Sequence, residues 1–384
     1  MPFTELQRQL DERTAQGLLR ARRTVSTPQS PNLIVDGKAC LSFCSNDYLG
    51  LACHPDIVAA LQQGAVEYGA GAGAAHLVSG HFYSHEKLEH ALASFVGKPR
   101  ALLFSTGYMA NIGVVQALVG RGDNIFADKL NHASLNDAML LSRANVKRYR
   151  HNDMEQLSVM LSQSGKGRKL VCTDAVFSME GDIAHLSGLQ ALCEQHDAWL
   201  LVDDAHGFGV LGEQGRGSLS HFALSSPRII YMATLGKAAG VSGAFVAGEA
   251  VVIETLINAA RSYVYTTATP PALSCALLES VRLIRSGDER RLRLQNLIAK
   301  LKCGLADLPW PLLDSNTAIQ PLIIGKNQAV INLSLALKER GIWVAAIRPP
   351  TVPEGTARLR ITLSASHTEA EVDRLIAVLH ELAV

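Results

Sequence analysis

One rhythm dominates the middle of this chain: a short apolar run, then Gly, Ser or Asp, then a longer segment with helical periodicity. Such runs occupy Ala101–Phe104, Asn124–Ala127, Leu170–Thr173, Trp199–Val202, Ile229–Met232 and Ala244–Ala247. Continuous apolar strands separated by helices are typical of a mostly parallel sheet that is covered on both faces. In such sheets the chemistry gathers at the carboxyl ends of the strands. We therefore expect functional residues directly after these runs.

The C-terminal part of the chain follows a different pattern. Charge becomes denser from about residue 290, a strand is predicted over Ile319–Ile324, and an alternating strand over Ala357–Leu363. Thr368 is the predicted N-cap of a closing helix over 368–384. These features predict a smaller α+β domain. We predict an N-terminal helix and linker over residues 1–45, a large α/β domain over 46–288 and the small domain over 289–384.

The composition fits a large folded chain. Of the 384 residues, 48% are hydrophobic and 18% charged, which excludes disorder as the main state. The formal net charge of +1 gives no sign of nucleic-acid binding. The seven cysteines are odd in number and lack Cys-x-x-Cys spacing, so we expect no disulfide framework, no metal site and a cytoplasmic location. The uncharged stretch 101–120 contains Ser105, Asn111 and Gln116, which favours a strand–turn–helix over a membrane span.

Two patterns resemble binding motifs without their usual context. Gly69–Ala74 fits a loose dinucleotide-binding pattern, and Glu89 lies near the expected distance for a ribose acid. That motif needs a preceding strand, but residues 56–68 read as a helix, so we expect a flexible loop. His81, His85 and His90 could face a metal ion, yet no carboxylate completes a recognised site, so we expect exposed helix histidines.

Three neighbouring strand ends carry reactive groups. The run ending at Val202 delivers Asp203, Asp204 and His206. Lys237 follows the next run, in a stretch with no other charge from Ile229 to Gly248. A partly desolvated lysine has a lowered pKa and becomes a nucleophile for aldehydes.

The segment Phe104–Asn111 enters a helix through small residues, which leaves backbone N–H groups available for a phosphate. A phosphate cradle, an acid and an amine at adjacent strand ends are what pyridoxal 5'-phosphate requires.

The motifs that combine these groups resemble a known family. They are Ser45–Leu51, Asn131–Ser134, Val202–Gly207 and Thr234–Lys237. In this order they are similar to the α-oxoamine synthases of the fold-type I pyridoxal-phosphate enzymes, over nearly the whole chain. The resemblance implies an aspartate aminotransferase-like α/β fold: a large domain with a mostly parallel seven-stranded sheet, plus a small α+β domain. It also implies a homodimer with active sites at the subunit interface.

The family resemblance also suggests the substrates. The segments Ala346–Pro353 and Gly355–Arg360 resemble the corresponding segments of family members that use L-alanine. Those members condense L-alanine with a pimeloyl thioester, with loss of carbon dioxide and release of a thiol carrier. The carrier, coenzyme A or an acyl carrier protein, stays open. Alternatives are a glycine-using relative of the glycine C-acetyltransferase or 5-aminolevulinate synthase type, a nicotinamide dehydrogenase, and a catalytically inactive relative. Intact Lys237, Asp203 and His132 argue against the last. We expect no nucleic-acid or membrane partner.

The resemblance implies a role for each site residue. Lys237 is expected to hold the cofactor as a Schiff base and then to act as the base, Asp203 to pair with the pyridine nitrogen, and His132 to stack on the ring. His206 and Ser178 are expected at the ring 3-oxygen. The phosphate ligands are expected to be Gly107, Tyr108 and Thr234, with Thr266 or Thr267 reaching it from the other subunit.

His132 is also expected to contact the substrate, and the other expected substrate residues lie near the two ends of the chain. Arg348 is expected to pair with a substrate carboxylate. Arg20 and Thr351 are predicted at the end of the pimeloyl chain, and Asn46 in the same cleft. Arg20 also has a simpler interpretation, as part of an exposed basic cluster with neighbouring arginines. Asp204, Arg358 and Arg360 are expected to be structural.

Overall fold

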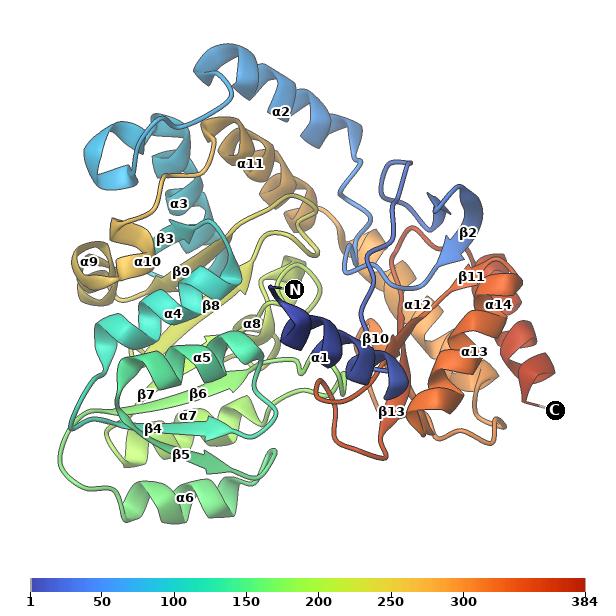
Figure 1. The fold of residues 1–384 in the computed structure, drawn as a ribbon. Helices are drawn as coiled ribbons and strands as arrows, with labels where there is room; N and C mark the ends of the chain where they lie inside the picture. Colours follow the sequence, from blue (N-terminus) through green and yellow to red (C-terminus); the bar gives the residue numbers. More distant parts are fainter. Residues whose placement is uncertain (1, 384) are drawn as a thin grey trace. The chain divides into compact units, whose positions relative to one another are not determined.

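The computed structural model describes residues 2–383 and separates into two compact units (Figure 1). The larger unit comprises Leu49–Ser178 and Ile183–Arg291, and the smaller unit comprises the chain up to Tyr48, Met179–Asp182 and the chain from Leu292 on. The sequence-based division placed its boundaries at residues 45/46 and 288/289 and did not separate the four-residue segment Met179–Asp182.

A seven-stranded sheet forms the centre of the larger unit. Its order is β3 (Arg100–Phe104), β9 (Ala244–Gly248), β8 (Ile229–Thr234), β7 (Trp199–Asp203), β6 (Lys169–Asp174), β4 (Asn124–Asp128) and β5 (Asn145–Tyr149). Neighbouring strands from β8 to β5 are parallel, whereas β9 is antiparallel to both β3 and β8. All six predicted strands are present, and the predicted fold class is confirmed.

Both faces of this sheet are buried, which explains why its strands read as continuous apolar runs. Alternate residues such as Leu102, Ile230 and Val246 belong to one core cluster with residues of α4 (Gly107–Leu118), α5 (Ala133–Ser142), α9 (Ala250–Ala259) and α10 (Arg261–Val264). The residues between them, such as Leu103 and Tyr231, are equally buried.

Strand β5 was not predicted. Its sequence, Asn-Val-Lys-Arg-Tyr, is polar and only partly buried, and it lies at one edge of the sheet. Charged side chains on an edge strand discourage pairing with another chain, and they also remove the apolar pattern by which a strand is recognised.

The larger unit contains further helices and helical turns. They are α2 (Pro55–Tyr68), the π-helical turn η1 (His76–Gly80), α3 (Tyr83–Val96), α6 (Met154–Ser162), α7 (Leu186–Gln195), the 3₁₀ turn η2 (Glu213–Gly215), α8 (Ser218–His221) and α11 (Pro271–Arg285). The uncharged stretch 101–120 is β3 followed by α4, as expected. Among the described residues, no helix combines the length and apolarity needed to cross a membrane.

The smaller unit is an α+β domain, as predicted. One sheet has the order β1 (Asn32–Val35), β2 (Lys38–Ser42), β11 (Ile342–Trp343), and another has the order β10 (Ile319–Gly325), β13 (Ala357–Thr362), β12 (Ala345–Ile347). Its helices are α1 (Thr4–Ala15), α13 (Asn327–Glu339) and α14 (Glu369–Leu382), together with most of α12 (Asp288–Gly304). Thr368 caps α14 as predicted, and Glu371 completes a capping box.

Candidate active site

The strand ends of the larger unit surround a cavity of about 110 Å³. It is lined by Gly107, Tyr108, His132, Ser134, Asp174, Val176, Asp203, Ala205, His206, Met232, Thr234 and Lys237. The structure thus brings together seven of the predicted site residues at the carboxyl edge of the sheet. Ser178, Thr266 and Thr267 are not among the lining residues.

Asp203 is the last residue of β7 and is only 5% exposed. Its Oδ1 accepts a hydrogen bond from the backbone N–H of Ala205 at 3.1 Å. Its Oδ2 accepts one from Nδ2 of Asn111, on α4, at 2.8 Å. Two donors from different elements therefore orient this carboxylate.

Asp174 is a second buried acid of the cavity, and the sequence analysis missed it. It ends β6 and pairs in register with Asp203 on β7. Burial and the nearby Asp203 carboxylate raise the pKa of Asp174 well above its ordinary value. Both carboxylate oxygens lie 3.2–3.3 Å from the backbone nitrogen of His132, which donates to them. The rule that drew attention to Asp203, an acid at the end of an apolar run, could have identified Asp174 as well.

His132 is the N-cap residue of α5. Its Nδ1 accepts from the backbone N–H of Ser134 at 3.2 Å and lies 2.8 Å from Oγ of the same residue. Burial lowers the pKa of His132; the Asp203 carboxylate opposes this shift and Lys237 adds to it. The neutral imidazole is therefore favoured at neutral pH.

Lys237 lies in the loop between the antiparallel strands β8 and β9. Leu235 and Gly243 close this loop by a backbone hydrogen bond of 2.8 Å, and Gly240 N–H donates to the carbonyl of Lys237 at 2.8 Å. Gly240 has φ +70°, and a Cβ there would lie 2.6 Å from the backbone nitrogen of Ala52. This glycine thus permits the tight turn that holds the half-buried lysine at the cavity.

The N-terminus of α4 forms another wall of the cavity. Thr106 caps this helix, because its Oγ1 accepts from the N–H of Met109 at 3.1 Å. Gly107 and Tyr108 are the first two residues of the helix, and their N–H groups lie ahead of this bond in the first turn. A Cβ on Gly107 would come within 2.5 Å of the methyl group of Thr234, so only glycine permits this approach. A helix N-terminus beside a threonine is suited to an anion such as a phosphate.

Apart from His132, the predicted substrate residues belong to the smaller unit, where they form two groups. Arg20 donates to Oγ1 of Thr351 at 3.0 Å, and Arg348 donates to the carbonyl of Gly17. Asn46 is separate from these contacts, because its Oδ1 accepts from the buried Arg360 at 3.2 and 3.3 Å.

The other two residues expected to be structural are also hydrogen-bonded in buried positions. Arg358 donates to the carbonyl of Met179 and to Glu180. Asp204 accepts from the hydroxyl of Tyr231 and the N–H of Ser218, both at 2.7 Å. Both therefore fit the expected structural role.

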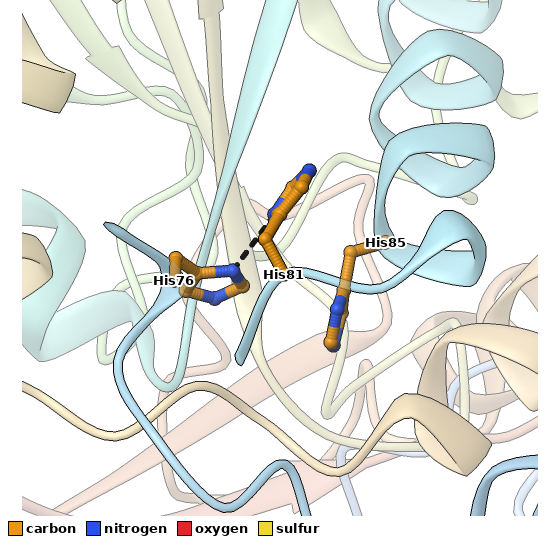
Figure 2. A group of neighbouring side chains, drawn as sticks. All are labelled: His76, His81 and His85. Atoms are coloured by element: carbon orange, nitrogen blue, oxygen red, sulfur yellow. Dashed lines mark hydrogen bonds between the residues drawn. The ribbon is translucent and has the colours of Figure 1, made fainter. Parts of the chain in front are cut away.

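The histidines of residues 76–85 correct one expectation (Figure 2). His85 is fully buried, His81 precedes α3, and His76 joins them, with its Nδ1 2.9 Å from Nδ1 of His81. Nδ1 of His85 accepts from the N–H of Phe82, and its Nε2 donates to the carbonyl of Thr269. Within this trio, only His76 and His81 share a hydrogen bond; both nitrogens of His85 bond elsewhere, and its ring contacts the other two. His81 and His90 are exposed, as expected, so only His85 departs from the expectation.

The dinucleotide-like segment has no strand before it. Gly69–Ala74 follows helix α2 directly, as predicted. Glu89 is 7% exposed and accepts from the N–H of Leu103 at 2.8 Å. It is therefore a structural acid of the core, and burial raises its pKa to about 8.

Comparisons with known proteins agree with this geometry. Residues 38–379 match the family described as aminotransferase class I and II. The 8-amino-7-oxononanoate synthase of Nitrosomonas europaea is 60% identical over 384 residues, covering 99% of each chain. That of Nitrosospira multiformis is 62% identical and covers 98% of this chain and 95% of its own.

Solved structures resemble the fold equally well. A serine palmitoyltransferase of Sphingomonas wittichii has a TM-score of 0.93 at 31% identity, covering 99% of this chain and 96% of its own. A high-resolution structure of SPT with a PLP internal aldimine has a TM-score of 0.93 at 30% identity, with the same coverage. An 8-amino-7-oxononanoate synthase of Francisella tularensis has a TM-score of 0.79 at 32% identity, covering 89% of this chain and 97% of its own.

Proposed function

Because the chain belongs to the class I and II aminotransferase family and, within it, to the 8-amino-7-oxononanoate synthases, we propose the following reaction. L-Alanine condenses with a pimeloyl thioester to give 8-amino-7-oxononanoate, carbon dioxide and the free thiol carrier, as a step of biotin biosynthesis. The enzyme is an acyltransferase, and its cofactor is pyridoxal 5'-phosphate.

The observation that best supports this proposal is the convergence of Lys237, Asp203, His132 and the α4 N-terminus on one cavity. The residues present fit the cofactor, since they supply an amine, an acid and an anion-binding helix end. When bound, pyridoxal phosphate withdraws electrons from the α-carbon of the amino acid.

Asp203 is proposed to hold a proton on the pyridine nitrogen. The N–H of Ala205 and the amide of Asn111 orient its carboxylate for this task. Lys237 is proposed to form the covalent link to the cofactor and then to remove the α-proton of alanine at its Nζ. His132 is proposed to stack on the ring, and His206 with Ser178 to donate to the 3-oxygen.

The phosphate is proposed to bind the N–H groups of Gly107 and Tyr108 and the hydroxyl of Thr234. We propose a homodimer in which Thr266 or Thr267 of one subunit reaches the phosphate bound by the other. In the smaller unit, Arg348 is proposed to bind a substrate carboxylate, with Arg20, Thr351 and Asn46 placing the acyl chain. In this role Arg348 exchanges the carbonyl of Gly17 for the substrate.

The acyl carrier is proposed to be coenzyme A or a transiently bound acyl carrier protein. We also propose a cytoplasmic location. All seven cysteines are free thiols, as befits a reducing compartment.

The test combines an absorbance spectrum with an activity assay. The holoenzyme should show a near-visible cofactor band that shifts on addition of L-alanine, and 8-amino-7-oxononanoate should form once pimeloyl-coenzyme A is added. Lys237→Ala should lose the band and the activity together, because it lacks the amine that binds the cofactor. A response to glycine with no response to alanine would favour the glycine-using relatives, and alanine-dependent activity of Lys237→Ala would refute the assignment.

A further inference from the structure

We propose that Asn111 is a positioning residue that orients Asp203 and, through Ser134, sets the tautomer of His132. The effect of Asn111 on catalysis rests on the proposed function, whereas its hydrogen bonds are independent of that function.

Asn111 lies on α4 and is 1% exposed. Its Nδ2 donates to Oδ2 of Asp203 and to Oγ of Ser134, both at 2.8 Å. A charged carboxylate only accepts hydrogen bonds, so the NH₂ group of the amide must face Asp203. One amide thereby joins the end of β7 to the first turn of α5.

The other end of this amide is unsatisfied. Oδ1 of Asn111 is buried and accepts no hydrogen bond from the described residues. A buried acceptor without a partner destabilises the folded protein, so packing alone does not explain an asparagine here. Asn111 thus donates two hydrogen bonds through Nδ2 while its Oδ1 accepts none. This arrangement is expected where the orientation of a site matters more than the stability of the fold.

The direction of the bonds determines the state of His132. Oγ of Ser134 accepts from Asn111, so its single proton is free to donate to Nδ1 of His132 at 2.8 Å. The backbone N–H of Ser134 supports the same arrangement at 3.2 Å. Because Nδ1 accepts, a neutral His132 carries its proton on Nε2. His132 therefore offers a hydrogen-bond donor at Nε2, beside a carboxylate whose orientation depends on the same amide.

The first experiment uses the apoenzyme and needs neither cofactor nor substrate. Protein labelled with ¹⁵N-histidine is examined by NMR, and the His132 signals are assigned from their loss in His132→Gln. The parent should show protonated Nε2 and unprotonated Nδ1. Asn111→Ala and Ser134→Ala should each show a detectable population of His132 protonated at Nδ1. This population should stay limited, because the backbone N–H of residue 134 still donates to Nδ1 in both variants.

The second experiment measures the dissociation constant of pyridoxal phosphate. Asn111→Ala should raise it about tenfold or more, since a hydrogen bond to a charged group is lost at Asp203. Ser134→Ala should change it by less than about threefold, because the Asn111–Asp203 bond remains. Gln116→Ala is the matched control, because it removes a partly buried amide from the same helix. It should change neither the tautomer of His132 nor the dissociation constant of pyridoxal phosphate.

If Asn111→Ala fails to fold, Asn111→Asp is used in its place. It has the same shape but places a second carboxyl group beside Asp203, so it should weaken cofactor binding as well. A variant that lowers the melting temperature but leaves the tautomer and the dissociation constant unchanged would make Asn111 a packing residue and overturn the proposal. Absence of synthase activity in the parent would refute the proposed function without altering the apoenzyme spectra.

Discussion

At the scale of single residues, burial raises the pKa of two acids at or beside the cavity, Asp174 and Asp204. Asp204 is fully buried, and its pKa rises to about 7 although Tyr231 and Ser218 donate to it. Asp174 is shifted in the same direction by burial and by its neighbour Asp203. In both acids the effect of burial exceeds that of the hydrogen-bond donors, which lower the pKa.

Glu89 permits a test of this view away from the cavity. Its pKa is about 8 in the folded protein against an ordinary value of 4.5, and one N–H, that of Leu103, donates to it. Between these values the folded state binds one more proton than the unfolded state, so stability falls as pH rises. The slope is up to about 1.4 kcal/mol per pH unit. We therefore expect Glu89→Gln to lose stability less steeply between pH 5 and pH 8, as followed by urea unfolding of the apoenzyme.

Glu381→Gln is the control for this prediction. Glu381 lies on α14 and is exposed, and its pKa is lowered by Arg340, which does not titrate in this range. Its replacement should leave the slope in the range pH 6–8 unchanged. Parallel profiles for the parent and Glu89→Gln over that range would mean that Glu89 is ionised in the folded protein.

At the scale of elements, helix ends are specified by few residues and are correspondingly sensitive. Oγ1 of Thr368 accepts from the N–H of Glu371, whose carboxylate accepts from the N–H of Thr368 at 2.8 Å. The three-residue spacing of Thr and Glu makes this capping box readable from sequence. Strand β5 is the opposite case, since its polar and partly exposed residues lack the apolar pattern that identifies the other strands.

We expect Thr368→Ala to destabilise the smaller unit by about 1 kcal/mol, because the first turn of α14 loses its side-chain acceptor. Urea unfolding of the apoenzyme measures this change. Thr368→Ser keeps the hydroxyl and should stay within about 0.5 kcal/mol of the parent. An equal loss in both variants would assign the effect to the methyl group of Thr368 and not to the cap.

At the scale of the whole molecule, the proposed homodimer predicts complementation between inactive subunits. Lys237→Ala is mixed with a Thr266→Ala/Thr267→Ala double variant under conditions that exchange subunits. In a hybrid dimer one site combines an intact Lys237 with the partner's intact threonines. About a quarter of the parent activity should return, since half of the dimers are hybrids with one intact site each.

Mixing Lys237→Ala with Asp203→Asn is the control. Both lesions fall in the part of the site that one subunit supplies, so each hybrid site stays defective. No recovery in either mixture, with hybrid dimers demonstrated by tagged subunits, would show that Thr266 and Thr267 act within their own subunit.

Much of the fold and of the cavity was predictable from sequence, because the signals are local. Apolar runs identified six of the seven strands, and the residues directly after them supplied Asp203, His206 and Lys237. Parallel strands bring their carboxyl ends to one edge whatever their separation along the chain, so this part of the site needed no knowledge of tertiary contacts.

The tertiary structure decided what depends on contacts between distant segments. Asn111 and Asp203 are 92 residues apart, and nothing in either local sequence indicates that the amide orients the acid. His85 is buried and bonds to the carbonyl of Thr269, 184 residues away, so it alone of the three predicted histidines was wrongly expected to be exposed. Local periodicity and motifs determine which elements form and which edge is reactive; burial, hydrogen-bond direction and pKa are set only when the elements pack together.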